Sequence, residues 1–299
     1  MGKAKQFILH LTARPRGWGA ARLRAAAKDH GVSIRGADPS KAMLVAGTDS
    51  ESIRFHSRRI TRPLAVLPRP GPGNYEDALM VLAHYESIGV PVCNTSRAIA
   101  LARDTYLSLL EFRKAGLPIP HTARLLSIKD LRIAYKQIPG PPWILKTFTG
   151  AMGIGTMLAW QKDQLEAVAA TLWALGQPIL MQEYIRTPDE HSADIRALVT
   201  GGKVIGAIRR SAPPGEFRAN VHRGGIPEAI KPNREQKKIA IAAANAIGLD
   251  IAGIDWIETK DGPVVMEANA TPGFQGFESA TGIDVAGAMI DFAIKKGRS

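Results

Sequence analysis

The feature of this 299-residue chain that most restricts its fold is a segment near the C-terminus, IAGIDWIETKDGPVVMEANATPG. Two apolar, β-prone runs flank Lys260-Asp261-Gly262, and Asp-Gly between such runs is a strong signal for a β-hairpin. A three-residue loop at 260–262 places Asp255 opposite Glu267. Because side chains alternate along a strand, Asn269 shares the face of these carboxylates. We therefore expect an acidic face on an otherwise apolar hairpin.

Such an acidic face predicts a metal site. Two neighbouring carboxylates repel each other and are costly to bury unless a cation lies between them. A few oxygen ligands with room for phosphate suit Mg²⁺ better than Zn²⁺, with Mn²⁺ as the alternative ion. A solvent-facing polar stripe is the other interpretation, but the flanking Val, Ile and Met residues are too apolar for it. We expect Asp255, Glu267 and Asn269 to ligate the metal.

A second candidate site is the glycine-rich segment WILKTFTGAMGIGTMLAW. Gly150, Gly153 and Gly155 lie between two strand-like runs, where glycines let backbone N–H groups approach phosphate oxygens. Lys146, at the end of the first run, supplies a positive charge for phosphate. The spacing is neither the Walker nor the Rossmann pattern, because the loop leads into a strand. Taken alone, Lys146 could equally be a lysine whose ammonium group lies in solvent. Taken together with the glycine-rich loop and the acidic hairpin, phosphate binding is the better interpretation.

Residues 207–225, AIRRSAPPGEFRANVHRGG, concentrate side-chain donors, among them Arg210, Arg218 and Asn220. Guanidinium groups bind carboxylates and phosphates through two parallel hydrogen bonds, so the cluster is suited to stabilise charge during phosphoryl transfer. Contact with a nucleic-acid backbone, or a solvated loop, is the alternative. His222 is assigned no role.

Strand-like and helix-like segments alternate over the first 95 residues. Strands are expected at 5–11, 32–34, 65–67 and 90–94, and helices at 18–30 and 77–88. This alternation predicts a small parallel α/β lobe. A chain of this length exceeds the usual single domain, and we predict an α/β fold of three lobes: 1–95, 96–184 and 185–299.

Further elements are expected in the two later lobes. A helix is predicted from Ser96 through Ala115, and others at 162–175 and 233–247. The expected strands are 143–146, 156–160, 178–184, 195–199, 203–209, 251–257 and 263–268.

The formal charge of +12 is concentrated in the first 100 residues, which contain 15 Lys/Arg and 7 Asp/Glu. A basic lobe attracts polyanions, so an acidic protein tail, a nucleic acid and a phosphorylated ligand are candidate partners, while a plain solvated surface is the alternative. No apolar run has the roughly 18 residues that cross a bilayer, and we see no secretory leader. We expect a cytoplasmic homo-oligomer without a membrane partner, and read the single cysteine, Cys93, as a core residue.

Taken in order, these segments resemble the RimK-type branch of the ATP-grasp ligases, which attach glutamate to a C-terminal carboxylate of a small-subunit ribosomal protein. The likeness runs from about 96 to 290, through KTFTGAMGIG, MQEYI, ADIRALV, FRANVHRGG, AGIDWI, VVMEANATPGFQGFE and TGIDVAG. The first lobe matches only loosely, through LPRPG and VPVCNTSRAIALARD. The resemblance implies an ATP-grasp fold with an N-terminal pre-ATP-grasp lobe.

The resemblance also implies roles for single residues. Lys146 contacts phosphate, Glu183 and Tyr184 form the hinge against adenine, and Asp194 holds the ribose side. The residues implied at the γ-phosphate and acyl phosphate are Arg218 and Asn220, with Arg210 assisting. The implied magnesium ligands are Asp255, Glu267 and Asn269.

One position departs from the family pattern. Family members usually have Lys after Arg-Asp in the helix that follows the first lobe, whereas this chain has Thr105 in ARDTYL. A hydroxyl does not replace that positive charge on the phosphates, so either nucleotide affinity is lower or nearby arginines compensate.

The implied activity is an ATP- and Mg²⁺-dependent carboxylate–amine ligase that works through an acyl phosphate. It would add glutamate, or another free amino acid, to an acidic protein or peptide. A small-molecule or peptide-tailoring ligase is the rival within the class. A nucleotide- or nucleic-acid-binding protein without catalysis is the rival outside it, motivated by Thr105 and the charge.

Overall fold

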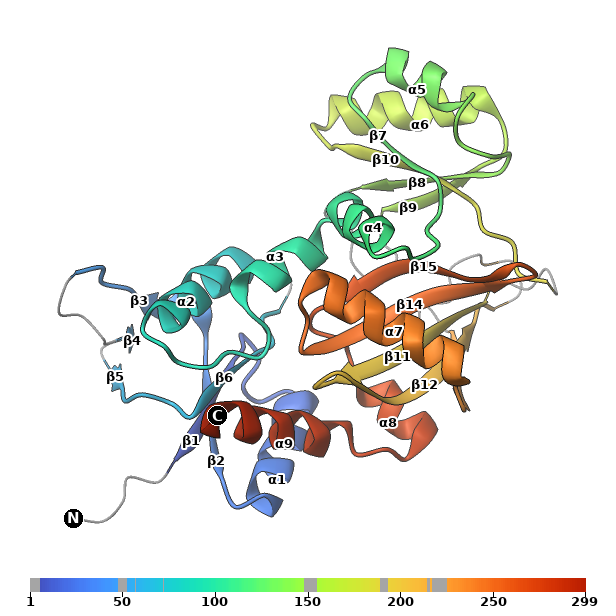
Figure 1. Cartoon of the computed structure of the whole chain (residues 1–299). Coiled ribbons are helices and arrows are strands. Elements are labelled where there is room, and N and C mark those ends of the chain that lie inside the picture. Colours follow the sequence, from blue (N-terminus) through green and yellow to red (C-terminus); the bar gives the residue numbers. More distant parts are fainter. Residues whose placement is uncertain are drawn as a thin grey trace, which may run out of the picture.

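A computed structural model describes residues 6–47, 53–56, 58–71, 73–147, 155–188, 193–213, 216 and 225–299. Its elements form three groups, each built around a sheet of its own (Figure 1). The α/β fold class predicted from the sequence is observed. None of the helices in the described part of the chain is long and apolar enough to cross a membrane.

The first group is a parallel sheet of order β2-β1-β6. Its strands are β1 (Phe7–Leu11), β2 (Ser33–Ala37) and β6 (Ala65–Pro68), and its first two helices are α1 (Trp18–Asp29) and α2 (Tyr75–Ser87). All five residues of β1 are buried, because helices cover both faces of the sheet. The predicted parallel lobe is confirmed, but the run at 90–94 joins the sheet only through a bridge between Val66 and Val92.

Three short strands missed by the sequence analysis form a separate antiparallel sheet beside this lobe. They are β3 (Ala42–Met43), β4 (Ile53–Phe55) and β5 (Arg58–Ile60). None is long enough to show a clear alternation of apolar and polar residues, which is why pattern reading overlooks them.

The last helix, α9 (Val285–Arg298), packs against α1 and β6 of the first lobe. Its apolar residues Val285, Met289 and Ile290 share a core with Ile8 and Leu23. Figure 1 shows α9 beside α1, with the C-terminus close to the first sheet. Residues at the two ends of the chain therefore build one core, although α9 falls in the predicted third lobe by sequence.

The single helix predicted from Ser96 through Ala115 is wrong, because Asp104 divides it. The observed helices are α3 (Ser96–Arg103) and α4 (Thr105–Lys114). Asp104 is extended, with φ −92° and ψ 104°, and its side chain accepts a hydrogen bond from the backbone N–H of Leu107. This N-cap starts a new helix whose first residue is Thr105.

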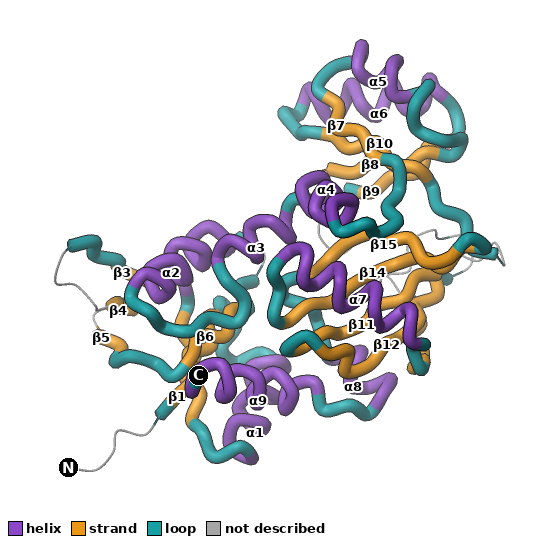
Figure 2. Tube along the Cα trace, in the orientation of Figure 1, coloured by secondary structure: helices purple, strands orange, loops and turns teal. Residues whose placement is uncertain are grey.

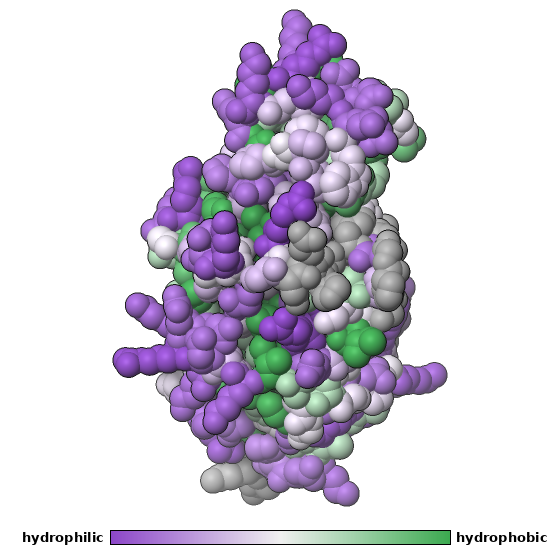
Figure 3. Space-filling model, turned by 90° about the vertical axis from the view of Figure 1, so that its right-hand side faces the viewer, coloured by the Kyte–Doolittle hydropathy of each residue, from purple (hydrophilic) through white to green (hydrophobic). Residues whose placement is uncertain are grey.

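The second group is an antiparallel sheet of order β7-β10-β8-β9. Its strands are β7 (Thr122–Leu125), β8 (Trp143–Thr147), β9 (Thr156–Ala159) and β10 (Ile179–Glu183), covered by α5 (Ile128–Ala134) and α6 (Lys162–Ala174). Figure 1 places both helices on the outer side of this sheet. In Figure 1 the other side of the sheet faces the third group, and Figure 3 shows mostly hydrophilic residues over the upper part of the molecule.

The third group is an antiparallel sheet of order β13-β12-β11-β14-β15. Its strands are β11 (Ala193–Thr200), β12 (Lys203–Ser211), β13 (Ile226–Ile230), β14 (Ile251–Thr259) and β15 (Gly262–Asn269). Helix α7 (Arg234–Ile247) packs on one face, as Figure 2 shows, and α8 (Gln275–Thr281) packs on the other. The face opposite α7 is therefore only partly covered, and it carries the candidate site.

Asn94 ties the first lobe to the hairpin that carries the acidic residues. Its side chain is fully buried and donates to the backbone oxygens of Ile251 and Ala270, both at 2.8 Å. It also accepts from the N–H groups of Asp250 at 2.7 Å and Ile251 at 2.8 Å. All four hydrogen-bonding positions of the amide are used, so Asn94 fixes the start of β14 and the end of β15 together.

We predict that Asn94→Ala lowers the free energy of unfolding by about 3 kcal/mol, since several buried backbone groups lose their partner. Denaturant unfolding followed by circular dichroism measures the change. Asn245→Ala, at an exposed position on α7, is the matched control and should change stability little. Equal effects of the two substitutions would contradict the anchoring role.

His10 in β1 should make stability depend on pH. Burial and the charges of Arg69 and Arg24 lower the pKa of His10 to about 3. Protonation below the unfolded-state pKa of about 6.5 therefore favours unfolding, and the stabilisation present above that pH is lost as the pH falls toward 3. Relative to His10→Leu, the protein should lose about 2 kcal/mol more between pH 7 and pH 5. Parallel pH profiles of the two proteins would refute this.

Candidate functional site

The hairpin places Asp255 opposite Glu267, as the sequence predicts. The turn differs from the predicted three-residue loop: it contains two residues, and Thr259 pairs with Gly262. The register then shifts between Trp256 and Asp255, which leaves Met266 as an extra residue on β15. This bulge adds the one residue that the predicted three-residue loop had supplied. The predicted loop is wrong, and the predicted pair is confirmed.

Alternation of side chains builds the polar face. Asp194 and Arg196 of β11 point to the side of the sheet away from α7, together with Arg210 of β12 and Asp255 of β14. Further along the same face, apolar side chains such as Leu198 pack on α8 and α9. The face therefore changes from apolar to charged at the edge of the α8–α9 packing.

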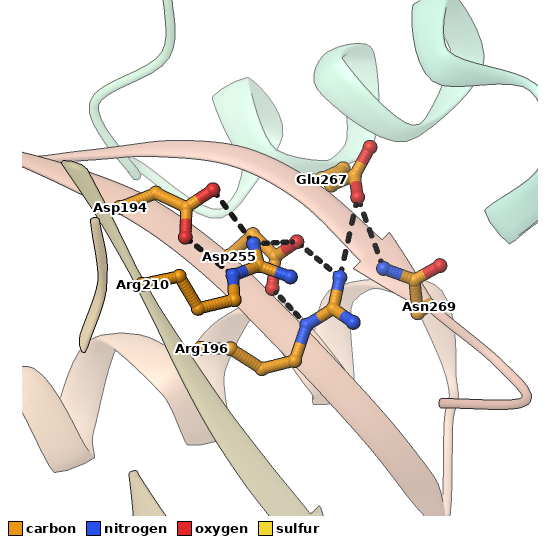
Figure 4. A network of polar contacts seen from close by, with 6 residues as sticks. All are labelled: Asp194, Arg196, Arg210, Asp255, Glu267 and Asn269. Atoms are coloured by element: carbon orange, nitrogen blue, oxygen red, sulfur yellow. Dashed lines mark hydrogen bonds and ion pairs between the residues drawn. The ribbon is translucent and has the colours of Figure 1, made fainter. Parts of the chain in front are cut away.

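Two arginines hold Asp255 (Figure 4). Nε of Arg196 donates to Oδ1 of Asp255 at 2.6 Å, and its Nη2 donates to Oδ2 at 2.5 Å. Nη2 of Arg210 donates to the same Oδ2 at 2.9 Å. Arg210 also binds Asp194, at 2.5 and 2.7 Å. Asp255 and Arg210 are each 3% exposed, so these charges are held inside the protein by one another.

Glu267 and Asn269 continue the network toward the end of β15. Nη2 of Arg196 lies 3.6 Å from Oε1 of Glu267, and Nδ2 of Asn269 donates to that oxygen at 3.0 Å. The Glu267 side chain is 45% exposed. The network therefore runs from a buried end at Arg210 to an accessible end at Glu267.

The two facing carboxylates have opposite pKa shifts. Burial opposes ionisation of Asp255, but the charges of Arg196 and Arg210 outweigh it and hold its pKa well below the usual range. Partial burial and repulsion by Asp255 raise the pKa of Glu267. Asp255 is therefore neutralised by two arginines, while the charge of Glu267 is only partly neutralised.

The oxygen atoms at the accessible end of the network are suitable ligands for a hard divalent cation. Asp255 and Glu267 face each other across the hairpin, and the amide of Asn269 provides a neutral oxygen beside them. Oδ2 of Asp255 accepts two hydrogen bonds and Oδ1 only one, so Oδ1 keeps an acceptor position. Across the described residues no three His, Cys, Asp or Glu side chains form a metal cluster, so the set consists of two carboxylates and an amide.

Lys146 of β8 comes close to this end from the second sheet. Burial lowers its pKa, and the charge of Glu267 acts against that shift. Gly155, after the glycine-rich loop, has φ +79°, and a Cβ there would lie 2.1 Å from Oγ1 of Thr147. Gly155 therefore has a steric reason to be glycine, independent of phosphate. Gly150 and Gly153 lie outside the described residues.

The other predicted nucleotide residues are spread along the edge of the site. Nδ1 of His121 lies 2.7 Å from the carboxylate of Glu183, and Arg186 lies over the ring of Tyr184. Asp194 lines a cavity of about 180 Å³ together with Thr187. Burial raises the pKa of Asp194 despite its pairing with Arg210. Arg218 and Asn220 lie outside the described residues.

Sequence reasoning missed Arg196, which makes the closest contacts to Asp255. The sequence offers only a partial signal, because Asp194 and Arg196 are two residues apart on one strand and therefore share a face. Finding the contact also requires the pairing that places Arg196 beside Asp255. The pairing of β11 with β14 is not encoded in either segment alone.

Comparison with known proteins agrees with this architecture. Two family models match, a RimK PreATP-grasp domain over residues 7–99 and a RimK-like ATP-grasp domain over residues 102–293. A probable alpha-L-glutamate ligase of Serratia proteamaculans (strain 568) is 38% identical over 277 residues, which span 93% of this chain and 92% of that protein.

Solved structures share the fold. The ATP-grasp ligase PsnB complexed with minimal precursor has a TM-score of 0.78 at 24% identity, covering 98% of this chain and 100% of its own. PsnB with a phosphomimetic variant of that precursor, Mg and ADP has a TM-score of 0.74 at 23% identity, with 98% and 99% covered.

The chain belongs to the RimK-like ATP-grasp family. It is an ATP-grasp carbon–nitrogen ligase, and this family uses ATP and Mg²⁺. The resemblance inferred from the sequence motifs and the ATP-grasp fold with its pre-ATP-grasp lobe are both confirmed.

We predict that Arg196→Met destabilises the protein by about 3 kcal/mol, because a buried carboxylate loses its main partner. Adding Asp255→Asn to Arg196→Met should recover part of the loss, with an interaction energy of about 2 kcal/mol in a double-mutant cycle. Lys295→Met breaks the exposed ion pair with Asp291 on α9 and should cost less than about 1 kcal/mol. Additive effects of Arg196→Met and Asp255→Asn would refute the coupling.

Proposed function

We propose that the protein adds L-glutamate to a C-terminal carboxylate of an acidic protein or peptide, through an acyl phosphate. The observation that carries the proposal is the carboxylate pair of buried Asp255 and accessible Glu267, with Lys146 close to Glu267 from another sheet. A cation held by the carboxylates and a lysine opposite them suit a triphosphate bound between the two sheets. The similarity to the probable alpha-L-glutamate ligase of Serratia proteamaculans supports the choice of amino acid.

The reaction proceeds in two displacements. A carboxylate oxygen of the acceptor attacks the γ-phosphorus of ATP, the bond to the β-phosphate oxygen breaks, and ADP leaves. The amine nitrogen of glutamate then attacks the acyl carbon, phosphate leaves with the carbon–oxygen bonding pair, and the nitrogen loses a proton. The sum is an amide, ADP and phosphate, with no covalent intermediate on the protein.

The residues of this chain bind and orient the reactants. Asp255, Glu267 and Asn269 are the proposed ligands of Mg²⁺, which when bound neutralises charge on the transferred phosphate. Lys146 is proposed to bind phosphate oxygens from the opposite side. Arg210 is held by Asp194 and Asp255, and this supports a role in positioning Asp255 within the site. Mn²⁺ is proposed to substitute for Mg²⁺ at the same oxygens.

The nucleotide is proposed to extend from these ligands along the edge of the third sheet. Asp194 and the cavity beside it lie at that edge, next to the connection from Glu183 and Tyr184, the proposed hinge against adenine. Arg218, Asn220, Gly150 and Gly153 keep their proposed roles at the phosphates. The basic first lobe supports an acidic acceptor.

The test incubates the protein with ATP, Mg²⁺, L-glutamate and a peptide with a free acidic C-terminus, and weighs the products. The expected result is a mass increase of one glutamyl residue per addition, with stoichiometric ADP. No increase with any amino acid from a folded protein would contradict the proposal.

Glu267→Gln should lower the rate roughly a hundredfold or more, because a metal ligand contributes several kcal/mol to charge stabilisation. Asp261→Asn removes an exposed carboxylate at the turn of the same hairpin and should leave the rate within about twofold. Unchanged turnover in Glu267→Gln would exclude Glu267 from the metal site.

A further inference from the structure

Arg69 lies where the first lobe meets the acidic hairpin. It directly follows β6, at the carboxyl end of the parallel sheet, and its backbone N–H donates to the carbonyl of Leu11 at 2.8 Å. Its side chain reaches the loop that follows β15. Nη2 donates to the carbonyl of Pro272 at 2.6 Å, and Cζ lies 5.0 Å from the ring centroid of Phe274. Ligands of parallel α/β sheets bind at this end of the strands.

Within the described residues, no carboxylate pairs with Arg69. Its remaining contacts are Sδ of Met289, 3.9 Å from Nη1, and the nearby Tyr75. A guanidinium carries five N–H donors, and here a single one bonds to an oxygen. Burial lowers the pKa of Arg69 to about 10, so it is charged at neutral pH. Arg69 is half-buried, and a partly desolvated cation without an anionic partner among the described residues leaves a position for an anion.

The surroundings of Arg69 are also positive. The charges of Arg69 in the loop after β6 and of Arg24 in α1 both act on His10 of β1, which is neutral above about pH 3. Arg103, at the end of α3, lies 4.1 Å from the ring centroid of Tyr75. The hydroxyl of Tyr75 is 3.0 Å from Oγ1 of Thr271, in the loop that Arg69 contacts. Arg69 thus contacts the loop at 270–274 directly, and Arg103 is linked to it through Tyr75.

The loop at 270–274 lies against the metal face, meaning the face of the hairpin that carries Asp255, Glu267 and Asn269. Pro272 comes three residues after Asn269, and a Cβ at Gly253 would lie 3.0 Å from Cβ of Pro272 and 3.6 Å from Nε of Arg196. Gly253 pairs with Asn269 across the hairpin. Pro272, whose carbonyl accepts the hydrogen bond from Arg69, therefore lies directly beside β14, the strand that carries Asp255.

We propose that Arg69 binds a substrate carboxylate at this junction, namely the α-carboxylate of the amino acid that supplies the attacking amine. This inference rests on the proposed function. The acceptor carboxylate loses its charge when it is phosphorylated, whereas the amino acid keeps its α-carboxylate throughout the reaction. That charge needs a fixed cation beside the metal face, and the planar guanidinium suits it through two parallel hydrogen bonds.

The experiment measures steady-state kinetics of Arg69→Gln and Arg69→Lys, with L-glutamate and the acidic peptide varied in turn. Arg69→Gln should raise KM for L-glutamate about tenfold or more, with kcat and KM for the peptide within about twofold. Arg69→Lys, which keeps the charge but not the paired hydrogen bonds, should be intermediate. L-isoglutamine, which has an α-carboxamide, should be a poor substrate for the unmodified protein, and Arg69→Gln should lose this discrimination.

Arg62→Gln is the matched control. Arg62 precedes β6, at the opposite end of the strand, and its Nη2 likewise donates to a backbone carbonyl, that of Gly89, at 2.8 Å. All kinetic constants of this variant should stay within about twofold.

Three outcomes overturn the proposal. A rise in KM for the peptide alone would assign Arg69 to the acceptor carboxylate. A fall in Tm with equal loss of kcat in both Arg69 variants, or no kinetic change at all, would leave Arg69 as a contact between lobes.

If the unmodified protein makes no product with any amino acid, the proposed function fails, and binding then decides the role of Arg69. Equilibrium dialysis with L-glutamate and L-isoglutamine, in the presence of ADP and Mg²⁺, should show a preference for L-glutamate that Arg69→Gln abolishes. No preference in the unmodified protein would overturn the proposal.

Discussion

Two carboxylates face each other on an apolar hairpin, and the surrounding structure offsets the cost of placing them there. Asp255 is stable as an anion because Arg196 and Arg210 surround it with charge-assisted hydrogen bonds. Among the described residues, Glu267 receives a longer contact from Arg196, the amide of Asn269 and the more distant charge of Lys146. This asymmetry leaves one end of the network short of positive charge. It is the physical reason to expect a cation there.

The rest of the chain holds this network in place and brings other groups to it. Asn94 fixes both strands of the hairpin to the first lobe, and α9 joins the core of that lobe. The site thus rests on a core that both ends of the chain build together. Lys146 approaches from a different sheet with its own core. Ligands between the sheets would contact residues of both.

Sequence reasoning succeeded where local patterns determine the structure. The Asp-Gly turn and the alternation of side chains were enough to pair Asp255 with Glu267, and the strand–helix alternation was enough for the parallel lobe. Local patterns also explain the failures. The turn is one residue shorter than predicted, and the bulge at Met266 adds one residue to β15. The two effects on the register cancel, so Asp255 and Glu267 were paired correctly from an incorrect loop.

Other features depend on contacts between distant segments. Arg196 meets Asp255 only because β11 pairs with β14, and Arg69 reaches Pro272 only because the first lobe docks on the hairpin. Neither contact leaves a periodic signal in the sequence. The N-cap at Asp104 was visible as an Asp before a helical run, but a continuous apolar pattern on both sides concealed the break.

The central claim is that the hairpin face holds a metal ion together with the nucleotide. Titration calorimetry of ADP binding, with and without Mg²⁺, tests it most directly in the unmodified protein and in Glu267→Gln. The account predicts that Mg²⁺ strengthens ADP binding to the unmodified protein and that Glu267→Gln loses most of this gain while its affinity for ADP without metal is preserved. An equal gain from Mg²⁺ in both proteins would contradict it.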